Sequence, residues 1–343
     1  MNWSIRLLIW VSFIPALLIL LYTLGPRVET YELSPTVSWY RKPPVPLCAM
    51  DSLVAATEPA NIKANNQARI VWGTDSIQTT PYAMVYLHGF TSSYGEGLPI
   101  HEKIAHEFGI NTYIARLQAH GLVTDSPLVD FRPVPYLQSV KEALRIGSLL
   151  GDTLLVMGTS TGAMMAMYLA AHNPEINRLI LLSPNIELHD PAAFLLDEPW
   201  GYQIAKLVFG GELSVEEPES EQHAQYWYKA FAVKSLTYLK SLMDYTMTDE
   251  TLQAIQQPTY IGYYYRNEEE QDQTVSVDAM LVFKGILEEN RVPHVFQAFP
   301  NAQHHVIGSR ITNPHWENVY HSIKTYLIQE AYLPVKSVTT EPK

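Results

Sequence analysis

Gly158-Thr159-Ser160-Thr161-Gly162 follows an apolar run, residues 153–157, and precedes a second apolar run, residues 163–171, with the character of a buried helix. A strand that breaks into a helix through Gly-x-Ser-x-Gly makes a turn so tight that small residues must flank the serine two positions away on each side. The turn presents the serine hydroxyl at the carboxyl edge of a sheet. The pattern therefore predicts Ser160 as a nucleophile.

A further apolar run, residues 83–87, ends in His88-Gly89-Phe90-Thr91. A loop at this position is expected to give one backbone N–H to an oxyanion hole, and the residue after the nucleophile gives the other. We expect these donors to be the amides of Phe90 and Thr161. Gly89 has no Cβ, so the loop can approach a substrate carbonyl closely.

The general base is expected downstream, after the last predicted strand, residues 294–298. His304 and His305 follow this strand and precede a helix that should begin near Asn313-Pro314, where proline suits the first turn. One of the two is expected to take the proton of the nucleophile.

The acid that orients the base should follow the preceding strand, residues 258–265. The loop after that strand carries four acids, including Glu270 and Asp272. Asp190 follows the strand before it. Glu270 and Asp190 are the alternatives to Asp272.

Residues 115–121, Ala-Arg-Leu-Gln-Ala-His-Gly, resemble the Arg-Leu-x-Gly-His-Gly signature of the serine α/β-hydrolases, with Ala119 where that family has glycine. This stretch and the turn at Ser160 resemble the carboxylesterase and monoacylglycerol-lipase-like branch of that family. The resemblance covers residues 67–330, apart from a cap. His120 is expected to be a structural loop residue.

This resemblance implies a catalytic triad of Ser160, Asp272 and His305. His305 with the two residues after it resembles the His-Val-Ile of small bacterial carboxylesterases, which favours it over His304. An Asp-x-x-Val sequence that leads into a helix, as at Asp272, is where this fold places the acid.

Composition limits the classes of function. The chain of 343 residues is 47% apolar, so it can bury a large core. Its net charge of −12 and the lack of a Lys/Arg cluster argue against nucleic acid as a partner. A single cysteine, Cys48, excludes an intrachain disulfide. No metal-ligand spacing occurs, and neither a cofactor nor a metal ion is expected.

Leu7 to Pro26 is an uncharged apolar run. At about 1.5 Å per residue its 20 residues reach about 30 Å, the thickness of the hydrocarbon core of a bilayer. No small-residue cleavage site follows, so we expect an uncleaved single-pass anchor in the membrane. Arg6 precedes the run and Arg27 follows it, and the side on which the catalytic domain lies stays open.

The rest of the chain alternates strands and helices, as in a mostly parallel sheet with helices on both faces. The interval between residues 190 and 257 is too long for one crossover, and we expect a helical cap inserted after the sixth strand. The expected divisions are an anchor (1–26), a stalk against the domain (27–66), a first segment of the hydrolase core (67–189), the cap (190–257), a second segment of the core (258–333) and a polar tail (334–343).

The cap is rich in large apolar side chains, of which some should face Ser160 and line an acyl pocket; Trp200 and Trp227 are the first candidates. We expect a membrane-anchored serine hydrolase that cleaves carboxylic esters, including monoacylglycerols or other lipid-derived esters. An acyltransferase, a thioesterase or a serine peptidase could use the same triad. A non-catalytic binding protein on this fold is the remaining alternative.

Overall fold

The computed structural model describes residues 3–215, 217–331 and 333–335. Within them one sheet contains seven strands: β1 (Arg69–Val71), β2 (Thr80–Leu87), β3 (Asn111–Ile114), β4 (Gly151–Thr159), β5 (Ile176–Leu182), β8 (Thr259–Tyr263) and β9 (His294–Ala298). Their order across the sheet is β1-β3-β2-β4-β5-β8-β9. Neighbouring strands are parallel except β1, which runs antiparallel to β3.

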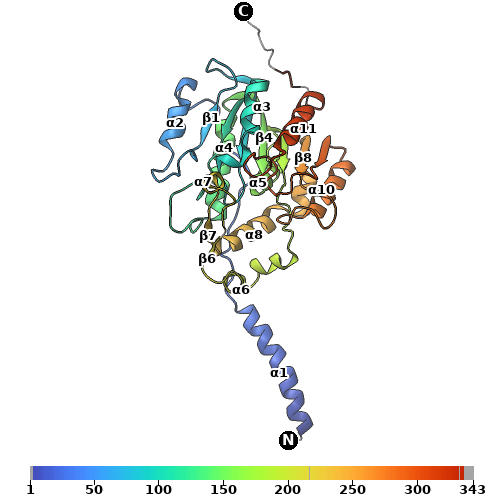
Figure 1. Cartoon of the computed structure of the whole chain (residues 1–343). Coiled ribbons are helices and arrows are strands. Elements are labelled where there is room, and N and C mark those ends of the chain that lie inside the picture. The colour runs from blue at the N-terminus through green and yellow to red at the C-terminus, as the bar shows by residue number, and fades with distance from the viewer. Residues whose placement is uncertain (1–2, 216, 332, 336–343) are drawn as a thin grey trace, which may run out of the picture.

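Helices cover both faces of this sheet because the side chains of its strands alternate between two apolar cores. In β2, Val85 and Leu87 join the core that contains α4 (Pro133–Gly147), α5 (Thr161–His172) and α10 (Val277–Glu289). Met84 and Tyr86 join the opposite core, with α3 (Ile100–Phe108) and α11 (Trp316–Gln329). Helices therefore lie on both faces of the sheet (Figure 1), and inner strands such as β3, β5 and β8 are almost wholly buried. The edge strands β1 and β9 are partly exposed.

The N-terminal helix α1 (Trp3–Thr23) extends away from this body, beside α6 (Gly201–Val208) (Figure 1). Its last turn contacts the cap through Trp200, whose indole N–H donates to the carbonyl of Leu21 at 3.0 Å. Among the residues that the structure describes, no helix combines the length and apolar character needed to cross a bilayer. The membrane anchor predicted over residues 1–26 is therefore not supported, nor is the membrane partner or location inferred from it.

The predicted stalk, residues 27–66, lies against the domain. The backbone N–H of Val37 donates to Asn173 Oδ1 at 2.8 Å, and Lys141 Nζ donates to the carbonyl of Ser34 at 3.0 Å. A short 3-10 turn (Leu47–Ala49) leads into α2 (Met50–Ala56), where Met50 is fully buried. Residues 336–343 of the predicted polar tail lie outside the described residues.

The cap occupies the connection between β5 and β8. Its described elements are η3 (Pro191–Leu196), α6, β6 (Leu213–Val215), α7 (Glu221–Tyr226), β7 (Ala230–Ala232), α8 (Lys234–Thr246) and α9 (Asp249–Ala254). It is not wholly helical, because β6 and β7 pair as an antiparallel ladder. The cap follows β5, the fifth strand along the described chain, and not a sixth strand as predicted.

Candidate active site

The predicted strand, turn and helix around Ser160 are present as β4 and α5. Ser160 has φ 53° and ψ −119°, a backbone conformation that costs a non-glycine residue free energy. The turn is held by the end of β5, since Ser160 N–H donates to the carbonyl of Leu182 at 2.9 Å and the N–H of Asn185 donates to the carbonyl of Ser160 at 3.2 Å. The strained turn is thus fixed by its neighbouring strand.

Both glycines that flank the serine are required by close backbone contacts. A Cβ on Gly158 would lie 2.7 Å from the backbone nitrogen of Ala163, and one on Gly162 would lie 2.2 Å from the carbonyl oxygen of Leu87. Contacts this short do not occur in folded proteins, so α5 approaches β2 and β4 only because both positions lack a side chain.

Asp272 and His305 meet at the carboxyl edge of the sheet, on the loops after β8 and β9. His305 Nδ1 donates to Asp272 Oδ2 at 2.7 Å. The other carboxylate oxygen of Asp272 accepts the N–H groups of Thr274 at 2.9 Å and Val275 at 3.2 Å. Because the Nδ1 proton is used by the carboxylate, Nε2 of a neutral His305 is an acceptor.

The electrostatics of this pair follow from its burial and contact. Burial alone would raise the pKa of the Asp272 carboxyl, but the charge and hydrogen bond of His305 and the two backbone donors hold it below its ordinary value. Burial would lower the pKa of His305, but Asp272 raises it, and Glu96 adds a smaller effect in the same direction. The pair therefore favours ionised Asp272 and stabilises a protonated imidazole.

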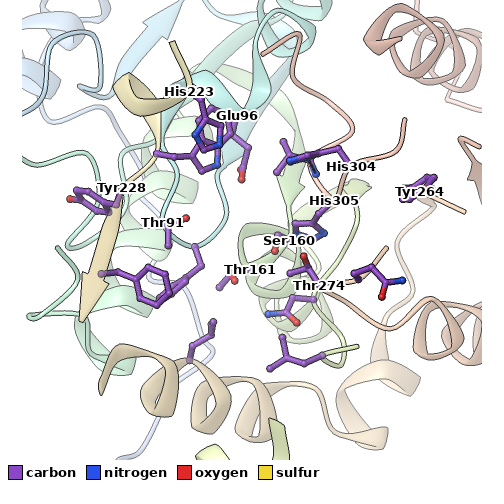
Figure 2. A pocket seen from close by; sticks show the side chains of 18 of the residues that line it. Thr91, Glu96, Ser160, Thr161, His223, Tyr228, Tyr264, Thr274, His304 and His305 are labelled. Atoms are coloured by element: carbon purple, nitrogen blue, oxygen red, sulfur yellow. Dashed lines mark hydrogen bonds between the residues drawn. The ribbon is translucent and has the colours of Figure 1, made fainter. Parts of the chain in front are cut away.

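His305 Nε2 is buried and has no hydrogen-bond partner among the described residues. His305 and Ser160 line the same cavity, and Figure 2 shows the imidazole beside the serine. The nitrogen that could accept a proton is thus placed next to the hydroxyl that could lose one.

The alternative residues make other contacts, although His304 lines the same cavity as Ser160 and His305. His304 Nε2 contacts Glu219 Oε1 at 3.1 Å, and its Nδ1 accepts the N–H of Val306 at 2.8 Å. Glu270 pairs with Arg266 at 2.8 Å on the exposed side of its loop. The carboxylate of Asp190 accepts the N–H of Ala192 at the start of η3. None of these three contacts the Asp272–His305 pair through a hydrogen bond.

Phe90 and Thr161 line the cavity on the other side of Ser160. Thr161 is the first residue of α5, so its N–H has no acceptor within the helix. Among the described residues, no hydrogen bond uses the N–H of Phe90 or Thr161. Both amides are free to donate to a substrate oxygen, and the start of a helix favours negative charge at this point.

Two buried histidines brace the loop that carries Phe90. His88 Nδ1 donates to the Gly89 carbonyl at 2.9 Å, and its Nε2 accepts the N–H of Leu117 at 3.0 Å. Burial lowers the pKa of His88 to about 4, which keeps the ring neutral. The ring of His120 lies 5.0 Å from that of His88 and 6.0 Å from that of Phe90. These contacts tie the loop after β2 to the loop after β3.

Glu96 is a site residue that the sequence analysis missed. It lies in a short 3-10 turn (η2, Tyr94–Gly97), is only 1% exposed, and lines the cavity with Ser160. Its Oε2 accepts the N–H of Gly89 at 2.6 Å and the hydroxyl of Tyr86 at 3.2 Å. Burial raises the pKa of Glu96 to about 7, although these donors and the charge of His305 lower it. The one signal in the sequence is its position between two glycines.

The cavity above Ser160 measures about 520 Å³, a size that suits a small organic ligand. The cap supplies an apolar wall from Leu196, Trp227, Tyr228, Phe231, Leu236 and Leu239. Of the two predicted tryptophans, Trp227 lines the cavity, whereas Trp200 lies at the start of α6 against the N-terminal helix. No group of three or more His, Cys, Asp or Glu side chains in the described ranges is arranged to hold a metal ion.

No protein-family model and no curated protein sequence matches the chain. Solved structures do. A lipolytic enzyme from the study of the metagenome-derived LipS and LipT aligns with a TM-score of 0.57 and 17% identity over 78% of this chain and 98% of its own. A thermostable carboxyl esterase from Bacillus coagulans aligns with a TM-score of 0.57 and 15% identity. The alignment covers 78% of this chain and 96% of the esterase. A monoacylglycerol lipase from Paleococcus ferrophilus aligns with a TM-score of 0.54 and 13% identity. The alignment covers 76% of this chain and 97% of the lipase. The chain has the fold of these proteins, the α/β-hydrolase fold.

Proposed function

We propose that this protein is a serine hydrolase that cleaves carboxylic esters through Ser160, His305 and Asp272. The observation that carries the proposal is the 2.7 Å hydrogen bond between His305 Nδ1 and Asp272, with the unpartnered Nε2 beside the strained serine. A serine at such a turn, a base next to it and an acid that orients the base are the components that acyl transfer requires.

In the proposed reaction, neutral His305 takes the proton of Ser160 as Oγ attacks the ester carbonyl. Asp272 holds the imidazole in the correct tautomer and stabilises its protonated form. The N–H groups of Phe90 and Thr161 receive the oxyanion, and His305 returns its proton to the leaving alcohol. Water then attacks the acyl-enzyme by the same steps and releases the acid.

We further propose that the apolar wall of the cap binds the acyl chain of a neutral or lipid-derived ester. Each methylene buried there should add up to about 0.8 kcal/mol of binding, or severalfold in kcat/KM. Turnover of p-nitrophenyl esters should therefore rise from acetate and reach a maximum at a medium chain, where the cavity ends.

Two tryptophan variants test this pocket. Trp227→Ala enlarges the cavity and should move the maximum to longer chains. Trp200→Ala is the matched control, since it removes a cap tryptophan outside the cavity, and it should leave the maximum in place. A flat profile, or an equal shift in both variants, would mean that the cap does not select the acyl chain.

The choice of reaction is tested with thioesters, aminoacyl amides and added alcohols as acyl acceptors, each assayed beside the preferred ester. Faster turnover of a thioester or an amide, or transfer to an alcohol in preference to water, would assign the site to another acyl-transfer reaction.

A further inference from the structure

Glu96 offers the cavity a carboxylate oxygen that the proposed reaction does not use. Oε2 accepts the Gly89 N–H and the Tyr86 hydroxyl, and neither of these two hydrogen bonds ends on Oε1. The hydroxyl of Ser92 donates to the Gly89 carbonyl at 3.0 Å, and a hydrogen bond from the same side chain lowers the pKa of Glu96. Since a carboxylate accepts about four hydrogen bonds, Oε1 has capacity for a further donor.

Glu96 Oε1 lies close to Ser160. A Cβ built on Gly89 would be 2.9 Å from Glu96 Oε1 and 3.0 Å from Ser160 Cβ, so the carboxylate and the serine flank the same point. Figure 2 shows the Glu96 carboxyl group directed into the cavity, on the side of Thr91 and Ser160. A group that contacts Oε1 would therefore belong to the substrate close to its ester.

The surroundings of Glu96 define the chemistry of such a group. A buried carboxyl group such as that of Glu96 requires donors, and no lysine or arginine is found among the described residues that line the cavity. Glu217 and Glu219 line the same cavity, so an anionic substrate would meet like charges. A cationic substrate would oppose the imidazolium that His305 becomes during the reaction. A neutral hydroxyl group satisfies the oxygen without either conflict.

We infer that Glu96 is a specificity-determining residue whose Oε1 accepts a hydrogen bond from a hydroxyl group of the substrate next to the scissile ester. The preferred substrates are then hydroxylated esters. This inference rests on the proposed ester hydrolysis at Ser160.

The test compares esters that differ only by a hydroxyl in place of a methyl group. Glycol monobutyrate against propyl butyrate examines the alcohol side, and ethyl β-hydroxybutyrate against ethyl isovalerate examines the acyl side. In one of these pairs the hydroxylated ester should have a kcat/KM about tenfold higher, since a site built to accept a hydroxyl discriminates strongly against the analogue without it. Butyrylcholine against its uncharged dimethylbutyl isostere measures the effect of charge alone and should show no preference for the cation.

Glu96→Gln retains an oxygen for the Gly89 N–H and turns an amide toward the cavity, so the substrate hydroxyl loses its charged acceptor and the preference should fall severalfold. Glu217→Gln makes the same chemical change at an exposed residue of the cavity and should leave the preference unchanged. An equal loss in both variants would assign the effect to the charge of the cavity and would overturn the inference.

The wild-type ratios keep the inference falsifiable even if Glu96→Gln does not fold. Ratios near one in both hydroxyl pairs, with both members hydrolysed and Ser160→Ala inactive, would overturn the role of Glu96 and leave ester hydrolysis standing. A preference for butyrylcholine alone would also overturn it. No hydrolysis of any ester would contradict the proposed function itself.

Discussion

Gly162→Ala adds one methyl group at the point where α5 starts behind the nucleophile. The new Cβ would lie 2.2 Å from the carbonyl oxygen of Leu87 and 2.6 Å from that of His88. Contacts between carbon and oxygen do not fall below about 3 Å, so α5 or the end of β2 must move by about 1 Å. Both contacts are with backbone atoms, so no side chain can rotate away to relieve the overlap.

We expect this substitution to destabilise the protein by about 3 kcal/mol, near the top of the range for overpacked cores. A shift of about 1 Å would also displace Ser160 and the N–H of Thr161, which should lower kcat/KM by about a hundredfold. Urea unfolding followed by circular dichroism measures the first effect, and p-nitrophenyl ester turnover measures the second.

Gly285→Ala is the matched control. Gly285 lies within α10, and a Cβ there would meet no atom within 4 Å. This variant should be more stable than the wild type by about 0.5–1 kcal/mol, with unchanged turnover. A Gly162→Ala protein with wild-type stability and turnover would refute the close approach of α5 to β2 and with it the geometry of the turn.

Three further predictions concern the candidate triad and one buried histidine, His101. Asp272→Asn should lower kcat by up to about ten-thousandfold. It should also move the acid limb of the pH–rate profile to lower pH, because Asp272 raises the pKa of His305 and only the neutral imidazole accepts a proton. An unshifted acid limb would assign the acid to another residue. His305→Ala should impair ester turnover as severely as Ser160→Ala, whereas His304→Ala should be much milder, and the reverse order would make His304 the base. Burial lowers the pKa of His101 to about 4, whereas the value in the unfolded chain is about 6.5. Between these pH values the unfolded state binds a proton that the folded state does not. The free energy of unfolding should therefore fall by about 3 kcal/mol as the pH falls from about 6.5 to about 4. In His101→Gln the difference between the urea-derived free energies at about pH 7 and pH 4 should shrink by this amount, and an unchanged difference would contradict the assignment.

Much of the core was predictable because short-range patterns determine it. The apolar runs at 83–87, 153–157, 258–265 and 294–298 predict β2, β4, β8 and β9, and the glycines around Ser160 predict the turn. The same logic predicted that Asp272 and His305 meet at the edge where β8 and β9 end, since the carboxyl ends of parallel strands lie together. These features depend on the residues next to them in the chain.

The features that escaped prediction depend on contacts between distant segments. Glu96 is a buried acid of the cavity because Gly89 and Tyr86 donate to it, and its own neighbours in the chain do not reveal this. Trp200 and Trp227 are equally apolar in sequence, but only the packing of the cap places Trp227 in the wall of the cavity that contains Ser160. The antiparallel pairing of β1 with β3 likewise follows from the path of the chain and not from its composition.

The covalent chemistry of Ser160 is the central claim, and intact-protein mass spectrometry after reaction with a fluorophosphonate tests it most directly. The wild-type protein should gain one phosphonyl group, and peptide mapping should place it on Ser160. Ser160→Ala should gain none and should retain less than about a thousandth of the ester turnover. A label on another residue, or higher activity in Ser160→Ala, would contradict a serine mechanism at this turn.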